Sequence, residues 1–420
     1  MRNRNAKLFS CWEFIAFDVR KALVALDPLS KILELPIGER ELRGLVHTPR
    51  EIFQQPDTWW GTFEKVNSIR HDIQSFLKQA GIYRESKERP SVFLIGAGTS
   101  DYVGRSVSTI LRQSWQCEVC AVPSTDVLTC LNDLCIKDNP YLWVSFSRSG
   151  DSSEGVAILE SALERSPEIR HIIVCCNEGG RMSSIRNDAQ NVCRIILSDE
   201  VNDKGLAMTS SYSNMVIAAQ CLAHLEDLDG YGRTLESLIA AARTLLPTAA
   251  EITEQLVAEK FSKICFLGTG PLQGVAVESA LKVVELTAGR VFSFSESFLG
   301  VRHGPLSAID RDTLVVAFVS TDQLRRAYEL DLLEEIKNKK LAKNILTVAL
   351  VREPEDEKRL AKVGIGLQLD TSVADCYRPP LDVLIGQLFG LFASIELGLR
   401  PDAPSPSGAI SRVVSKVNIY

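Results

Sequence analysis

Three ionisable side chains recur at helical spacing within residues 278–289. Glu278, Lys282 and Glu285 occupy positions i, i+4 and i+7, so in a helix they share one stripe. An ion-pair ladder on a solvated helix face would also explain this spacing. Most other residues of the segment are apolar or small, which is typical of a buried helix. We therefore expect the stripe to line a polar cavity, where burial and neighbouring charges tune carboxylate pKa values for acid–base chemistry.

His303 is a further candidate for proton transfer. The chain has only five histidines, and this one lies in a predicted loop between Gly300 and Gly304-Pro305. Imidazole titrates near neutral pH, which suits proton transfer. A loop histidine is as often structural, so this interpretation depends on the nearby carboxylate stripe.

A loop rich in hydroxyl groups follows the apolar run 141–144 and precedes a predicted helix that includes residues 156–160. The hydroxyl-bearing residues of interest are Ser147, Ser149 and Ser152. The first turn of a helix has unpaired N–H groups and a partial positive charge, and both favour phosphate. The alternative is a helix capping box that uses Asp151 and Glu154.

A second hydroxyl-bearing loop, Thr99-Ser100, follows the apolar run 91–95. The preceding Gly96-Ala97-Gly98 turn suggests a dinucleotide site, but Asp101 stands where that fingerprint needs a third glycine. Open α/β sheets bind ligands at the carboxyl ends of their strands, so both loops should face one crevice. Neither loop has a P-loop lysine, which favours a phosphomonoester over a nucleoside triphosphate.

Strands that alternate with helices must position these loops. Apolar strands are predicted at 91–95, 117–122, 141–146, 171–176, 192–197, 263–267, 313–319, 344–351 and 366–369. This alternation predicts an α/β fold with parallel sheets covered on both faces. Residues 263–272 repeat the pattern of 92–100, so we predict two doubly wound, three-layer αβα domains related by internal duplication, which meet near 245–260. Nothing in the second copy resembles the serine loop, so only the first copy should hold an anion with hydroxyl groups.

The domain organisation follows from this repeat. We predict a helical lead-in over 1–60, a first domain over 61–250 with the phosphate-binding loops, and a second domain over 251–400 with the catalytic helix and histidine loop. Residues 401–420 form a tail that begins with a turn-rich stretch.

Composition excludes several classes of partner. The chain has 420 residues, 45% hydrophobic and 24% charged, with a net charge of −6, so we expect no nucleic-acid partner. No apolar run approaches the roughly 18 residues of a membrane span. The eleven cysteines are odd in number, and the Cys117–Cys120 CxxC pair has no second half. We therefore expect no metal site, and reduced, mostly buried thiols in a cytoplasmic protein.

With these segments assembled, the chain resembles the sugar isomerase (SIS) domain family. It is most similar to the tandem-SIS branch of tagatose-6-phosphate ketose/aldose isomerases and galactosamine-6-phosphate deaminase/isomerases. The likeness runs from about residue 47 to the end. It is most specific at residues 96–100, 145–152, 202–211, 278–289, 302–305 and 404–408.

The resemblance implies roles for the candidate residues. The phosphate-binding hydroxyls would be those of Thr99, Ser100, Ser147, Ser149 and Ser152. Glu285 would move a proton between C1 and C2 of the open-chain sugar, and Lys282 and Glu278 match the lysine and second glutamate of that helix. His303 matches a ring-opening histidine, which in some relatives comes from a neighbouring subunit. No metal or organic cofactor is implied.

Two positions depart from the more distant synthase relatives. Arg148 replaces a glutamine between two serines, which changes the local charge. Ser415 stands where the synthases have a tail lysine, and we assign the next residue, Lys416, no catalytic role.

The implied function is deamination and isomerisation of a hexosamine 6-phosphate, most closely galactosamine-6-phosphate to tagatose-6-phosphate and ammonia, by a homo-oligomer (a dimer or tetramer). An aldose–ketose isomerase without deamination would use the same residues, because the leaving group is on the substrate. A sugar-phosphate-binding regulator would need the phosphate loops but not Glu278, Lys282, Glu285 and His303 together.

Overall fold

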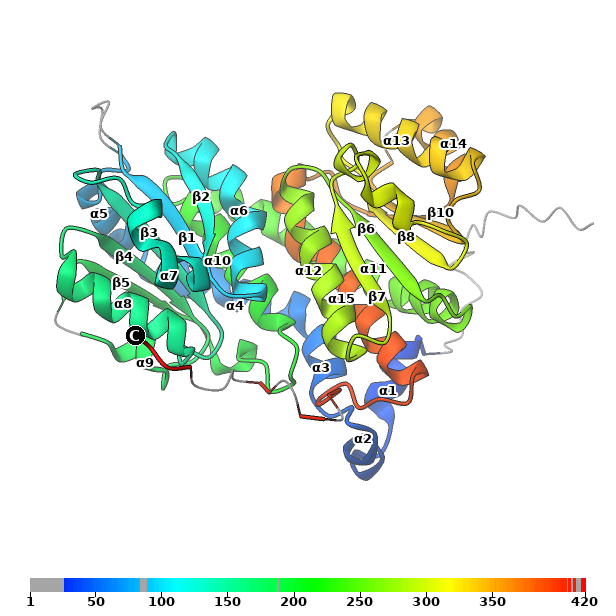
Figure 1. The fold of residues 1–420 in the computed structure, drawn as a ribbon, viewed down its shortest axis with the longest axis horizontal. Coiled ribbons are helices and arrows are strands. Elements are labelled where there is room, and N and C mark those ends of the chain that lie inside the picture. The colour runs from blue at the N-terminus through cyan, green and yellow to red at the C-terminus, as the bar shows by residue number, and fades with distance from the viewer. Residues whose placement is uncertain are drawn as a thin grey trace, which may run out of the picture.

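The computed structural model describes residues 26–83, 89–186, 189–351, 353–405, 407–408, 411–412 and 417–420. Part of the predicted lead-in, together with Ser415 and Lys416, lies outside these ranges. The described chain forms two five-stranded parallel sheets with helices packed against them (Figure 1). The predicted α/β class with two parallel-sheet units is confirmed.

The first sheet has the strand order β2-β1-β3-β4-β5. Its strands are β1 (Ser91–Gly96), β2 (Val119–Pro123), β3 (Tyr141–Ser147), β4 (Arg170–Cys175) and β5 (Val192–Ile196). All seven residues of β3 are buried, as expected for a central strand with both faces covered. The helices that follow these strands are α6 (Thr99–Trp115), α7 (Ser124–Leu134), α8 (Ser153–Arg165), α9 (Arg181–Ser184) and α10 (Ser210–Ala223).

The second sheet repeats this topology with the order β10-β9-β8-β6-β7. Its strands are β6 (Lys263–Leu267), β7 (Phe292–Glu296), β8 (Thr313–Phe318), β9 (Asn344–Ala349) and β10 (Ile365–Gln368). The helices of this half are α12 (Pro271–Leu286), α13 (Gln323–Asn338), α14 (Pro354–Val363) and α15 (Pro379–Glu396). Sequence analysis missed β7, because this edge strand alternates phenylalanine with serine instead of forming a continuous apolar run.

Helices fill the space between the two sheets. The N-terminal helices are α1 (Pro28–Glu34), α2 (Ile37–Arg43), α3 (Thr48–Phe53), α4 (Gln55–Ser68) and α5 (Arg70–Gln79). Helices α6 and α10 of the first half pack with α12 and α15 of the second, and one hydrophobic core joins residues of both halves. The long helix α11 (Leu228–Ala258) runs without a break across the predicted domain boundary at 250/251.

Two compositional expectations can be compared with the structure. Among the residues described, no helix is long and apolar enough to cross a membrane. All ten described cysteines are free thiols. Only Cys175, Cys176, Cys221 and Cys265 of these are buried, so the prediction of mostly buried thiols was wrong. Cys120 on the edge strand β2 and Cys130 at the non-helical kink inside α7 are both exposed.

Candidate active site

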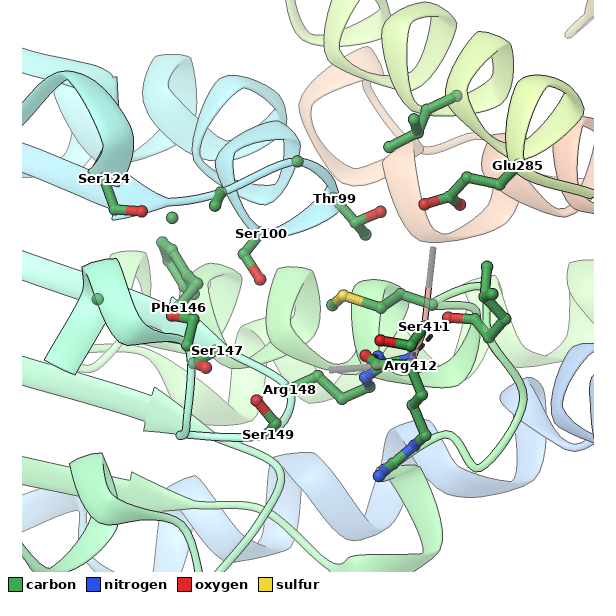
Figure 2. Close-up of a pocket in the computed structure, with 18 of the residues that line it drawn as sticks. Thr99, Ser100, Ser124, Phe146, Ser147, Arg148, Ser149, Glu285, Ser411 and Arg412 are labelled. Carbon is green, nitrogen blue, oxygen red and sulfur yellow. Dashed lines mark hydrogen bonds between the residues drawn. The ribbon is translucent and has the colours of Figure 1, made fainter. Parts of the chain in front are cut away.

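A cavity of about 850 Å³ lies at the carboxyl ends of the strands of the first sheet. The turn after β1, the serine loop after β3, the last turns of α12 and the C-terminal tail all contribute to its walls. Figure 2 shows Ser100, Ser147 and Ser149 around a common space, which Glu285 approaches from α12. The sequence-based expectation that both hydroxyl-bearing loops share one crevice agrees with this arrangement.

Backbone N–H groups of the serine loop donate hydrogen bonds to the hydroxyl oxygens of the same loop. The Ser147 Oγ accepts a hydrogen bond from the Gly150 N–H at 2.9 Å, and the Ser149 Oγ accepts one from the Asp151 N–H at 3.2 Å. Both hydroxyl protons therefore remain available for donation to a ligand. Gly150 has a positive φ of 70°, and a Cβ there would lie 3.0 Å from the Cys175 Sγ, so the turn requires glycine.

The capping-box alternative does not form. Ser152 is the N-cap residue of α8 and, in the described chain, its side chain makes no capping hydrogen bond. Asp151 instead accepts a hydrogen bond from the Arg181 N–H at 2.9 Å. The N–H groups at the start of α8 therefore have no side-chain cap and face the cavity side of the loop.

Thr99 connects the turn after β1 to the helix that carries the ionisable stripe. It begins α6 after a tight turn, in which a Cβ on Gly96 would lie 2.3 Å from the Ser100 carbonyl carbon. Its Oγ1 accepts a hydrogen bond from the Lys282 Nζ at 3.0 Å and donates one to the Glu278 Oε1 at 3.3 Å. One hydroxyl of the first half thus orders two charged groups of the second.

The stripe on α12 is buried and does not form a surface ladder. The side chains of Glu278 and Lys282 are 0% exposed, and that of Glu285 is 23% exposed. The Lys282 Nζ lies 2.5 Å from the Glu285 Oε2 and 3.3 Å from the Glu278 Oε1. Only Glu285 of the three lines the cavity, and the other two lie behind it.

Burial dominates the electrostatics of the stripe. Burial raises the pKa of Glu278 to about 8, against the attraction of the Lys282 ammonium. Burial alone would lower the pKa of Lys282, but the carboxylates of Glu278 and Glu285 outweigh it and raise that pKa. Lys282 therefore stays a cation and can orient Glu285, and burial raises the pKa of the neighbouring Glu278.

The structure does not bring His303 into the cavity of its own chain. This residue is exposed and follows a short 3-10 helix, Gly300–Arg302, beyond the edge strand β7. It is absent from the residues that line the cavity. Three of the four predicted catalytic residues therefore form one hydrogen-bonded group, and the fourth lies apart from them.

Sequence analysis missed the contribution of the tail to the cavity. Ser405, Ser407, Ser411 and Arg412 all line it. The Arg148 guanidinium donates to the carbonyl oxygens of Gly205 at 3.3 Å, of Leu206 at 3.0 Å, and of Arg412. Arg148 thus binds the main chain that closes the cavity. The only sequence signal for this wall was the resemblance to the SIS family at residues 202–211 and 404–408, and no role had been assigned to these residues.

The second half contains a counterpart of the serine loop that sequence analysis also missed. Ser320 and Thr321 follow β8, and both hydroxyls donate to the carboxylate of Asp375. This carboxylate belongs to the chain itself, so the contact does not test the expectation that only the first copy holds an anionic ligand with hydroxyl groups. The partner carboxylate is distant in sequence, so no local pattern revealed it.

Comparison with known proteins agrees with this geometry. Residues 86–225 match the SIS domain model. The chain is 34% identical over 381 residues to the D-galactosamine-6-phosphate deaminase AgaS of Escherichia coli. This alignment covers 89% of this chain and 95% of that protein. The chain belongs to the AgaS family of SIS-domain proteins.

Solved structures extend the likeness. A tagatose-6-phosphate ketose/aldose isomerase from Escherichia coli superposes with a TM-score of 0.79 and 31% identity, over 89% of this chain and 96% of that one. The C-terminal domain of the glucosamine-fructose-6-phosphate aminotransferase from Francisella tularensis has a TM-score of 0.68 at 18% identity, which shows a shared fold. It covers 85% of this chain and 98% of that one. The SIS match spans the first sheet, so membership of the AgaS family for the second half rests on the full-length likeness.

Proposed function

We propose that the protein is a cofactor-independent deaminase/isomerase that converts galactosamine-6-phosphate to tagatose-6-phosphate and ammonia. The observation that carries this proposal is the position of Glu285, which is bonded to Lys282 and lines the same cavity as the serine loop. An anion anchor and a partly exposed carboxylate in one cavity are what aldose–ketose chemistry on a sugar phosphate requires.

The phosphate group would bind in the serine loop. Ser147 and Ser149 keep hydroxyl protons to donate, and the helices α6 and α8 begin at this cavity with their positive ends toward it. Ser100 and Ser152 add further hydroxyls on the cavity wall. Binding energy from this remote phosphate would hold C1 and C2 of the sugar near Glu285.

Glu285 would act as the general base and then as the acid. It takes the proton from C2 of the open-chain amino sugar and returns it to C1, so that the enolamine becomes an imine at C2. Water adds to this imine, ammonia leaves, and the product is the ketose 6-phosphate. Lys282 orients Glu285 throughout, and Glu278 and Thr99 hold Lys282 in place.

His303 would assist ring opening from a second copy of the chain. Its exposed position outside its own cavity supports this assignment, as does the resemblance to relatives in which the histidine comes from a neighbouring subunit. The active protein would then be a homo-oligomer, a dimer or tetramer.

The test is a paired assay of ammonia release and ketose formation on galactosamine-6-phosphate, glucosamine-6-phosphate and tagatose-6-phosphate. We expect ammonia and ketose in equal amounts from galactosamine-6-phosphate. Interconversion of tagatose-6-phosphate with its aldose and no ammonia from either amino sugar would establish the isomerase instead. Binding of all three without turnover would establish a regulator and overturn the proposal.

A further inference from the structure

The loop after β8 has the same place in the second sheet as the serine loop has in the first. Ala317 pairs with Leu267 of β6 as Ser145 pairs with Ile95 of β1, so Thr321 takes the place of Ser149. The glycine turns beside the two loops also match: Gly98 has φ 55° and ψ −124°, and Gly270 has φ 62° and ψ −128°. The duplicated fold has therefore built the strand–loop–helix geometry of an anion site twice.

A carboxylate of the protein itself occupies the second of these loops. The Asp375 Oδ1 accepts hydrogen bonds from the Thr321 N–H and from the Thr321 Oγ1, both at 2.8 Å, while its Oδ2 accepts one from the Ser320 hydroxyl. Two guanidinium groups complete the shell, with Arg378 Nη1 at 3.1 Å and Arg325 Nη1 at 3.3 Å. Asp375 is 5% exposed.

This shell has the composition of a binding site for an oxyanion. It offers two hydroxyls, one backbone N–H and two guanidinium groups, and charge-assisted hydrogen bonds of this kind are the strong ones. Burial would raise the pKa of Asp375, but Arg378 and the hydroxyl and backbone donors outweigh it and lower the pKa. The carboxylate therefore stays ionised, as a bound anion would.

We propose that Ser320 and Thr321, with Arg325 and Arg378, form a second oxyanion site whose resident ligand is the Asp375 carboxylate. Asp375 belongs to the 3-10 helix Asp375–Tyr377, which directly precedes α15. Filling the site therefore attaches the start of α15 to the carboxyl end of β8, the central strand of the second sheet, and excludes a free phosphate. This inference does not depend on the proposed catalytic activity.

The test is chemical rescue of the Asp375→Ala variant. Its Tm should fall below that of the wild type, because five donors lose their acceptor. Acetate or inorganic phosphate should restore most of the lost Tm with a saturating dose response, since a ligand bound only to the folded state stabilises it. Sodium chloride at equal ionic strength should not.

Asp382→Ala is the matched control. Asp382 is a second buried carboxylate partner of Arg378, at 2.7 Å, but none of its hydrogen bonds involves Ser320 or Thr321. Anion binding at the first cavity is common to all variants and cancels in the comparison. An acetate shift in Asp375→Ala no larger than in Asp382→Ala, or equalled by chloride, would overturn the proposal.

A second measurement tests the proposal if the Asp375→Ala variant folds poorly. The refolding yield of Asp375→Ala from urea should rise with acetate or phosphate and not with chloride, and a yield indifferent to these anions counts against the site. Asp375→Asn keeps the side-chain shape and the site filled, so its Tm should be lowered without any response to acetate.

Discussion

The loops after β3 and β8 have equivalent positions in the two sheets, but one lines a cavity and the other is filled by a side chain of the protein. The first presents hydroxyl groups to a cavity of about 850 Å³, whereas the second encloses the carboxylate of Asp375. The backbone geometry of the adjoining turns is nearly identical. A duplicated fold therefore supplies the same strand–loop–helix geometry twice, and a residue far along the chain fills one of the two copies.

The largest effect should come from a residue that belongs to neither loop. Glu285→Gln keeps the shape of the side chain but removes the base, so kcat should fall by about 10²–10⁴-fold with little change in KM. Steady-state ammonia and ketose assays measure both. Glu254→Gln, an exposed position on α11, is the control and should leave turnover unchanged. Near-normal kcat in Glu285→Gln would remove this carboxylate from the mechanism.

The next prediction contrasts equivalent positions of the two loops. Ser149→Ala should raise KM by about 10- to 100-fold, because one hydrogen bond to a charged group contributes about 1.5–3 kcal/mol. Thr321→Ala should leave KM unchanged and lower the free energy of unfolding by about 1–3 kcal/mol, since it leaves Asp375 short of a donor. Kinetics and urea unfolding of both variants provide the comparison. A KM effect of equal size in both would mean that the second loop also serves the substrate.

The third prediction concerns Arg148, which lies in the first of the two loops and is replaced by glutamine. Arg148 binds the carbonyl oxygens of Gly205, Leu206 and Arg412, so its loss should loosen the tail over the cavity. The glutamine amide can keep one of the three hydrogen bonds, so at about 1 kcal/mol for each of the other two KM should rise by up to about 30-fold. Cleavage of the tail by a protease should become faster in the same variant. Arg243→Gln removes only an exposed ion pair with Asp57 and should change neither.

The smallest predicted effect concerns pH. The pKa of Glu278 is raised by burial from 4.5 to about 8, so the folded state binds a proton that the unfolded state has released across this interval. Stability of the wild type relative to Glu278→Gln should therefore be greatest below about pH 4.5, decline as pH rises between about 4.5 and 8, and level off above this interval. Urea unfolding of both proteins at a series of pH values measures the difference. A constant difference would show that Glu278 is already ionised at the lowest pH.

The features that could be predicted from the sequence are those that depend on local residue patterns. Continuous apolar runs identified nine of the strands, and the spacing of Glu278, Lys282 and Glu285 identified a buried stripe. The edge strand β7 was missed because only one of its faces is apolar. The Asp375 contact was missed because it joins residues 55 positions apart, and no periodicity records such a pair.

The candidate site was predictable only in part for the same reason. Hydroxyl side chains between a strand and a helix N-terminus favour an anion site, so the 147–152 loop was predicted to be one, and in the structure it lines the cavity. The partners of Arg148 are carbonyl oxygens, which every residue has, and nothing in the sequence distinguishes those of Gly205 or Leu206. The residues around His303 gave no sign that it lies outside the cavity of its own chain, and only the resemblance to relatives suggested that this histidine can come from a neighbouring subunit.

The continuous helix α11 also limits how a substrate can enter. Its 31 residues join the two halves as a single rod of roughly 46 Å at 1.5 Å per residue. A hinge needs a few residues that can change φ and ψ, and inside this helix Pro247 is the residue that cannot donate a backbone N–H to the helical ladder. The cavity is lined by residues of the two halves that α11 joins, so a domain-opening motion within this helix would have to bend it at Pro247. Sugar and ammonia would otherwise pass by the tail, whose residues line the cavity outside any strand or helix.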